Sequence, residues 1–83
     1  MARSVSLEPL QILFREGDEA TNAYVIVSGR IEIYHEQADG GVERIAVLQP
    51  GAMFGEMGPM DDAPRNASAR ALEKTVLNII DMV

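Results

Sequence analysis

The sequence has few of the residues on which metal and covalent chemistry usually depend. It contains no cysteine, no tryptophan and a single histidine, His35, among its 83 residues. Without cysteine there is no disulfide framework and no thiolate nucleophile, and zinc or iron sites that need several His or Cys ligands are disfavoured. The absence of cysteine also fits a reducing compartment. We therefore expect no metal and no cofactor.

Basic residues and long apolar runs are also scarce. Seven Lys and Arg residues face 13 Asp and Glu residues, which gives a net charge of −6. This field repels a polyanion, so we expect no direct nucleic-acid binding. The short apolar runs predict neither a signal peptide nor membrane insertion by this segment, and we expect a cytoplasmic protein. A small anionic ligand remains compatible, because a distant net charge is screened beyond about 10 Å.

The composition is otherwise that of a globular chain. Hydrophobic residues make up 47% and charged residues 24% of the sequence, which is the balance of a folded domain rather than a disordered segment. A chain of this length accommodates one small domain. We therefore treat residues 1–83 as a single domain.

Short apolar runs of period two recur along the chain, broken by glycine and proline. This pattern is typical of antiparallel β proteins. The pair Asp39-Gly40 is a strong hairpin signal, and Gly17 lies in a polar turn that can use its conformational freedom. The sequence predicts an all-β fold, a small antiparallel β-roll of jelly-roll type, with strands near residues 5–7, 10–14, 23–28, 30–35, 42–48, 67–72 and 75–80.

The segment 54–68 interrupts this rhythm. It has neither strand alternation nor the length of a full helix, and we expect one helical turn at about Glu56 to Met60 between bends marked by glycine and proline. Compact loops that retain their own apolar residues are often functional. The segment is therefore the candidate site.

The residue types in this segment suit an anionic ligand. Gly55 lets the backbone approach a ligand closely, and the free N–H groups of a short helical turn attract an anion. Arg65 offers a planar fork that pairs with a phosphate, and Glu56 is an acceptor suited to a hydroxyl. Together these groups describe the sugar–phosphate end of a nucleotide.

The order of these residues resembles a known family. Phe54-Gly55-Glu56-Met57, followed by Pro64-Arg65-Asn66-Ala67-Ser68, is similar to the phosphate-binding cassette of cyclic-nucleotide-binding domains. Such domains occur in the catabolite activator protein, in regulatory subunits of cyclic-AMP-dependent kinase and in gated ion channels. The resemblance extends from residue 10 to residue 82 and includes, in family order, the segments 14–18, 24–29, 45–51 and 69–71.

This resemblance implies a regulatory sensor that binds cyclic AMP or cyclic GMP and catalyses no reaction. Glu56 would accept a hydrogen bond from the ribose 2′-hydroxyl, and Arg65 would pair with the exocyclic phosphate oxygens. Backbone groups of Gly55 and Gly58, and of Asn66 or Ala67, would complete the contacts with sugar and phosphate. The implied ligand-binding residues are Gly55, Glu56, Met57, Gly58, Arg65, Asn66 and Ala67. Val47 and Leu48 are the implied wall for the base.

Three features depart from the family pattern. Leu10 stands where the family usually has glycine, which bears on the first bend rather than the pocket. Asn66 occupies a position where small residues are common, so the choice between cyclic AMP and cyclic GMP stays open. The family continues into helices that cap the base and carry the signal, whereas this chain stops at Val83. We therefore expect a domain core without lid helices, which in the full-length protein serves an output domain.

Two alternatives belong to other classes of function. The first is a β-roll of the same fold that binds no nucleotide and acts as a structural or protein-interaction module. The second is a cupin-type enzyme, which would need a cluster of His and carboxylate ligands. The adjacent Asp61 and Asp62 are the nearest approach to such a cluster, and we expect them to be solvated instead.

Overall fold

The computed structural model describes residues 3–56 and 63–81, and every regular element in these ranges is a strand. This confirms the predicted all-β class. The strands are β1 (Arg3–Leu7), β2 (Ile12–Phe14), β3 (Asn22–Ser28), β4 (Ile31–Glu36), β5 (Val42–Leu48), β6 (Met53–Phe54), β7 (Ser68–Ala71) and β8 (Thr75–Asp81). The helical turn predicted at Glu56 to Met60 lies, apart from Glu56 itself, outside the described residues.

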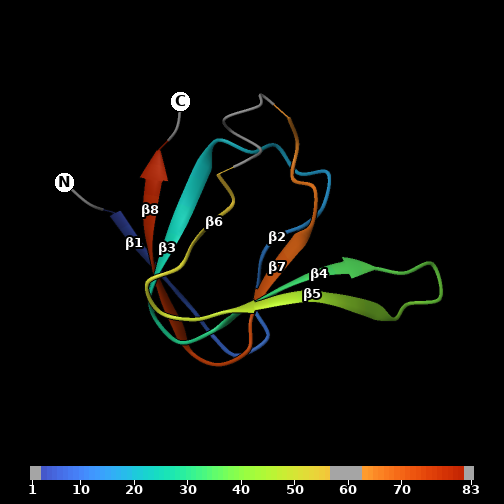
Figure 1. The fold of residues 1–83 in the computed structure, drawn as a ribbon, viewed down its shortest axis with the longest axis horizontal. Coiled ribbons are helices and arrows are strands. Elements are labelled where there is room, and N and C mark those ends of the chain that lie inside the picture. The colour runs from blue at the N-terminus through green and yellow to red at the C-terminus, as the bar shows by residue number, and fades with distance from the viewer. Residues whose placement is uncertain (1–2, 57–62, 82–83) are drawn as a thin grey trace.

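Two four-stranded antiparallel sheets form the roll. Their strand orders are β1-β8-β3-β6 and β2-β7-β4-β5. Strands from opposite ends of the sequence pair directly, since Arg3 lies opposite Ile79 and Leu7 opposite Thr75. Figure 1 shows the two sheets and the β4–β5 hairpin, which projects away from the body of the molecule. The predicted antiparallel β-roll is therefore confirmed.

The core lies between the sheets and follows from the period-two pattern. Alternate residues of a strand point to opposite faces, so Tyr24 and Ile26 of β3 and Leu77 of β8 meet Ile31 of β4 in the interior. The buried cluster consists of Leu7, Tyr24, Ile26, Ile31, Phe54, Ala69, Ala71 and Leu77. Small alanines on β7 leave room for the aromatic rings opposite them.

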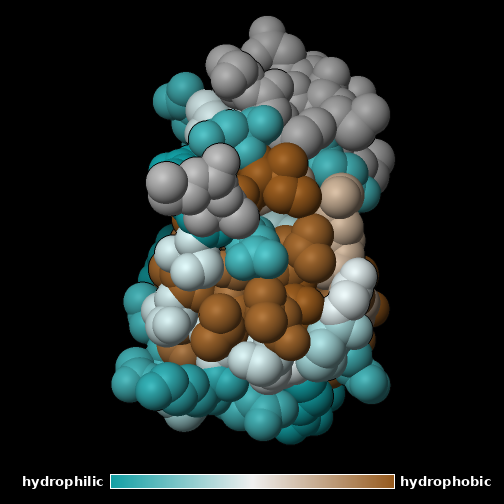
Figure 2. Space-filling model, turned by 90° about the vertical axis from the view of Figure 1, so that its left-hand side faces the viewer, coloured by the Kyte–Doolittle hydropathy of each residue, from teal (hydrophilic) through white to brown (hydrophobic). Residues whose placement is uncertain are grey.

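The outer face of the first sheet is partly apolar. Val25 and Val27 alternate with the buried Tyr24 and Ile26 of β3 and therefore point to the opposite face, and Val27 is half-exposed. Val76 and Ile80 alternate in the same way on β8. Figure 2 shows hydrophobic residues gathered on the side of the molecule that this sheet forms, with some hydrophilic residues among them.

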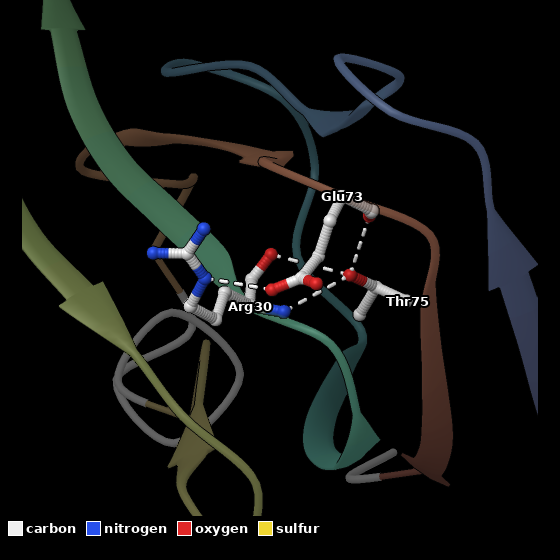
Figure 3. Close-up of polar contacts among 3 residues, drawn as sticks. All are labelled: Arg30, Glu73 and Thr75. Atoms are coloured by element: carbon white, nitrogen blue, oxygen red, sulfur yellow. Dashed lines mark hydrogen bonds and ion pairs between the residues drawn. The ribbon is translucent and has the colours of Figure 1, made fainter.

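Hydrogen bonds and an ion pair connect the β3–β4 turn to the start of β8. The buried Thr75 hydroxyl accepts a hydrogen bond from the Arg30 backbone N–H at 3.2 Å and donates to the Glu73 carbonyl oxygen at 2.8 Å. The Arg30 side chain pairs with the Glu73 carboxylate at 2.7 Å (Figure 3). Gly29 fits here because its φ is +90° and a Cβ would lie 2.6 Å from the Lys74 carbonyl oxygen.

A buried carboxylate lies on β4 between two core residues. Glu32 is 3% exposed, and its two oxygens accept hydrogen bonds from the Nε atoms of Arg44 and Arg70, each at 2.6 Å. Burial raises the pKa of Glu32, but the two guanidinium groups act in the opposite direction and hold the pKa below its ordinary value. This network ties β4 to both neighbouring strands, β5 and β7.

Two local features differ from the sequence-based expectation. The first is β6, whose two residues are too few to show alternation. The second is the start of the predicted strand 10–14, because Leu10 belongs to the bend before β2 and has a φ of +67°. A leucine therefore occupies the left-handed region that favours glycine. The chain still bends at this position, although the glycine that the family usually has there is replaced by Leu10.

Candidate functional site

A cavity of about 210 Å³ opens beside β6 and the segment that precedes β7. It is lined by Phe14, Ile33, Met53, Phe54, Gly55, Glu56, Arg65, Asn66 and Ala67. Five of the seven predicted site residues are thus brought together in one place. The other two, Met57 and Gly58, lie outside the described residues.

Strand β6 positions the first half of the site. Phe54 pairs with Tyr24 of β3, and Met53 pairs with Val25. Gly55 follows directly with a φ of +80°, which turns the chain out of the sheet and places Glu56 at the cavity. An added Cβ on Gly55 would lie 2.8 Å from Nη1 of Arg65, so glycine is required both for its backbone conformation and for space.

The polar turn after β2 positions the second half. The Arg65 backbone N–H donates to the Asp18 carbonyl oxygen at 2.9 Å, and the Gly17 N–H donates to the Arg65 carbonyl oxygen at 2.8 Å. The Ser68 hydroxyl accepts a hydrogen bond from the Glu16 N–H at 3.0 Å. The turn predicted around Gly17 therefore fixes the position of the Arg65 backbone through these hydrogen bonds.

The Arg65 side chain is buried and is held by backbone oxygens. Only 6% of the residue is exposed. Nη1 donates to the Gly55 carbonyl oxygen at 2.7 Å, and Nη2 donates to the Asn22 carbonyl oxygen at 2.8 Å. Nε is buried and has no hydrogen-bond partner in the part of the chain that the structure describes. Among the described residues the Nε–H donor of the guanidinium is therefore unused.

Aromatic rings surround this guanidinium. Its Cζ lies 4.2 Å from the ring centroid of Phe14 and 5.7 Å from that of Tyr24. Phe54 completes the cluster, with centroid distances of 6.3 Å to Phe14 and 5.5 Å to Tyr24. The positive charge is thus enclosed by apolar surface and π-faces rather than by carboxylates.

The charge of Arg65 is poorly compensated. Burial lowers the pKa of its guanidinium, although electrostatic interactions with Tyr24 and Asp18 act in the opposite direction. No ion pair joins Arg65 to a carboxylate within residues 3–56 and 63–81. An arginine keeps its proton in proteins, so a buried cation remains and an anion in the cavity would offset the cost of burying it.

The remaining predicted residues occupy different environments. Glu56 is half-buried, and no hydrogen bond joins its carboxylate to another residue that the structure describes. Ala67 is buried, whereas Asn66 is exposed. Both line the cavity beside Arg65.

The residues implied as a wall for the base lie outside the lining of this cavity. Val47 and Leu48 do not line the cavity. Leu48 packs against the core, and Val47 lies opposite Glu32, on the other face of the second sheet. The apolar lining comes instead from Phe14, Ile33, Met53 and Phe54.

Other kinds of site find no support in the described ranges. Within residues 3–56 and 63–81 no group of three or more His, Cys, Asp and Glu side chains is arranged to hold a metal ion. The same residues contain no helix with the length and apolar character of a membrane span. The cavity around Arg65 is therefore the feature on which we base a function.

Comparison with known proteins places this cavity in a wider context. The family model of the cyclic nucleotide-binding domain matches residues 4–82. An uncharacterised ABC transporter ATP-binding protein of Mycobacterium tuberculosis is 41% identical over 68 residues, which are 82% of this chain and 21% of that protein. The chain therefore spans about a fifth of the length of this relative.

Solved structures share the fold closely. The cAMP-bound form of the EAL enzyme Bd1971 matches with a TM-score of 0.91 and 40% identity, covering 96% of this chain and 22% of that one. A cGMP-bound form of the same enzyme matches with the same TM-score. The Thermus thermophilus catabolite activator protein matches with a TM-score of 0.89 and 30% identity, covering 98% of this chain and 38% of that one.

Proposed function

The chain belongs to the cyclic nucleotide-binding domain family, and from that premise we propose that it binds cyclic AMP or cyclic GMP as a regulatory sensor. The proposal includes no catalytic step by these residues. It also takes residues 1–83 as one domain core that works in the cytoplasm. The similarity to Bd1971, whose structures include cAMP-bound and cGMP-bound forms, supports either ligand.

The buried guanidinium of Arg65 is the observation that carries the proposal. It lines the cavity together with Glu56, has a buried Nε–H without a partner among the described residues, and lacks an ion-pair partner there. A cyclic phosphate entering the cavity would supply both an acceptor and a compensating negative charge. Charge-assisted contacts of this kind contribute about 1.5–3 kcal/mol each.

The other lining residues have roles that fit the rest of a nucleotide. Glu56 would accept a hydrogen bond from the ribose 2′-hydroxyl, and Gly55 would present its backbone to the same sugar. Backbone groups at Asn66 or Ala67, with Met57 and Gly58 outside the described ranges, would complete the phosphate contacts. The base would lie toward Ile33 and the half-exposed Met53 at the edge of the cavity.

A sensor also needs an output. Because the relatives are several times longer than this chain, we propose that the full-length protein carries an output domain and lid helices. Ligand binding would then shift the population of conformations, with the segment around Arg65 drawn onto the phosphate and the output domain responding. The small-molecule ligand is the partner of this domain, and nucleic acid and membrane are not.

Isothermal titration calorimetry of the 83-residue chain tests the proposal. We expect cyclic AMP or cyclic GMP to bind, and adenosine, which has the base and sugar without the phosphate, to bind more weakly. Binding of adenosine as tightly as cyclic AMP would show that the phosphate does not contribute to affinity. Failure of both cyclic nucleotides to bind at millimolar concentration would favour a β-roll that serves only as a structural or protein-interaction module.

A further inference from the structure

The Arg65 guanidinium lies over the ring of Phe14. The Cζ-to-centroid distance of 4.2 Å is the shorter of the two contacts between this cation and an aromatic ring. The two hydrogen bonds to the carbonyl oxygens of Gly55 and Asn22 leave through Nη1 and Nη2, at one end of the group. Two hydrogen bonds, the contact with Phe14 and the more distant ring of Tyr24 therefore define the position of the guanidinium.

The hydrogen bonds and the aromatic contact restrain different movements of the guanidinium. Hydrogen bonds from Nη1 and Nη2 lie near the plane of the guanidinium and fix where its end points. They restrain tilting of that plane only weakly. The Phe14 ring, 4.2 Å from Cζ, limits movement of the guanidinium toward that side. A desolvated cation also gains attraction from the π-face that it would lack beside an aliphatic side chain.

The ring is itself held firmly. Phe14 belongs to β2, where it lies opposite Ala69 of β7. Its ring packs against Tyr24 and Phe54, with centroid distances of 6.1 Å and 6.3 Å. Because β2 leads directly into the turn that carries the Arg65 backbone, the ring and the arginine share one support.

We infer that Phe14 is a positioning residue, which orients the Arg65 guanidinium so that its Nε edge is available to the phosphate of a bound ligand. The inference rests on the proposed function for its consequence in binding. It adds a residue that acts through Arg65 rather than through a hydrogen bond of its own. Loss of the ring should therefore weaken phosphate binding only while Arg65 is present.

A double-mutant cycle on the 83-residue chain separates positioning from simple lining of the cavity. The variants are Phe14→Leu, Arg65→Ala and the double variant, titrated with cyclic AMP by calorimetry. A cation–π contact predicts that Phe14→Leu weakens binding roughly 2- to 30-fold. In the Arg65→Ala background the same change should have little effect, because the cation is gone. An equal loss in both backgrounds would overturn the inference.

Further variants control for packing. Phe14→Tyr keeps the ring and should restore affinity to within a factor of about two of wild type. Phe14→Met fills the volume without a π-face and should behave as Phe14→Leu does, which also serves if the leucine variant is poorly folded. Phe54→Leu alters the same aromatic cluster, and its effect on affinity should be the same in the wild-type and Arg65→Ala backgrounds. Full affinity in Phe14→Met would contradict the inference.

Thermal unfolding without ligand makes failure of this inference distinguishable from failure of the proposed function. If the wild type binds no cyclic nucleotide, the function proposed above is wrong, yet the ring and the cation are still in contact. The wild type, the two single variants and the double variant of the cycle should then show Tm shifts that are not additive. Phe14→Leu should lower Tm less in the Arg65→Ala background than in the wild type. Strictly additive Tm shifts would show that Phe14 does not hold Arg65.

Discussion

Nη1 of Arg65 lies 2.7 Å from the carbonyl oxygen of Gly55. This hydrogen bond joins the two halves of the candidate site, which are ten residues apart along the chain and are supported by different parts of the fold. Gly55 ends β6, whereas Arg65 is mounted on the turn after β2. The relationship means that the backbone at position 55 and the guanidinium at position 65 cannot move independently.

Replacement of Gly55 by alanine should therefore damage the site more than the fold. The positive φ of +80° costs a non-glycine residue about 1–2 kcal/mol. In addition, the new Cβ would displace Nη1 of Arg65, which lies 2.8 Å from its position. We expect affinity for cyclic AMP to fall at least about tenfold, the loss of roughly one charge-assisted hydrogen bond. Calorimetry and thermal unfolding on the same samples measure both effects.

Gly40→Ala is the matched control for this variant. Gly40 has a φ of +88°, and an added Cβ would meet nothing within 4 Å. It should therefore lose a similar amount of stability while keeping the affinity of the wild type. If both variants bind equally well, contact between Gly55 and Arg65 is irrelevant to ligand binding.

The Thr75 hydroxyl should contribute to stability but not to binding. Thr75→Val keeps the shape of the side chain and leaves the Arg30 N–H without its acceptor. We expect a loss of about 1–3 kcal/mol, the cost of an unpaired buried group, measured by urea unfolding. Thr75→Ser retains the hydroxyl and should lose about 1 kcal/mol or less, for one methyl group. A valine variant as stable as the wild type would contradict this assignment.

Leu10→Gly should make the protein more stable. Leu10 is 64% exposed, so little packing is lost, and its φ of +67° is costly for a branched side chain. Relief of about 1–2 kcal/mol of backbone strain exceeds the entropy cost of glycine, about 0.5–1 kcal/mol. A rise in the urea midpoint is expected, and a fall would show that Leu10 makes apolar contacts that outweigh the strain.

Stability should depend on pH through Glu32. The pKa of this carboxyl is lowered in the folded protein by Arg44 and Arg70, despite the opposing effect of burial. Its contribution is therefore complete above the unfolded-state pKa of about 4.3 and is lost as the pH falls through the lower folded-state value. Glu32→Gln should cost about 1.5–3 kcal/mol at neutral pH and flatten the acid limb of the stability curve.

Glu36→Gln provides the comparison for the pH experiment. Glu36 pairs with Arg15 at 3.2 Å, but both side chains are more than half exposed. An exposed pair contributes about 0–1 kcal/mol, so the neutral-pH stability and the acid limb should stay close to those of the wild type. If the two glutamine variants behave alike, the buried network has no special role.

The strands and the core could be predicted because they depend on local alternation. Tyr24 and Ile26 on β3, and Ile31 and Ile33 on β4, recur with the period of a strand. The hairpin signal at Asp39-Gly40 requires only two residues in sequence. Strand β6 escaped prediction because two residues cannot display a period. Glu32 escaped because its burial depends on Arg44 and Arg70, which reach it only after the second sheet has formed.

The candidate site was predictable in its chemistry and not in its surroundings. Gly55, Glu56 and Arg65 carry side-chain or backbone properties that can be read from residue type. The carbonyl oxygen of Asn22 gives no such signal, because every residue has one. Phe14 belongs to a segment that matches the family in sequence, but only the packing of β2 against Arg65 identifies its contact with the cation.

The most direct test of the account is the affinity of Arg65→Ala and Arg65→Lys for cyclic AMP and cyclic GMP, measured by isothermal titration calorimetry beside the wild type. We predict that Arg65→Ala binds about 10- to 150-fold more weakly and that Arg65→Lys recovers only part of the loss, because an ammonium lacks the planar fork. Unchanged affinity in Arg65→Ala would contradict the central claim that this buried cation receives the phosphate.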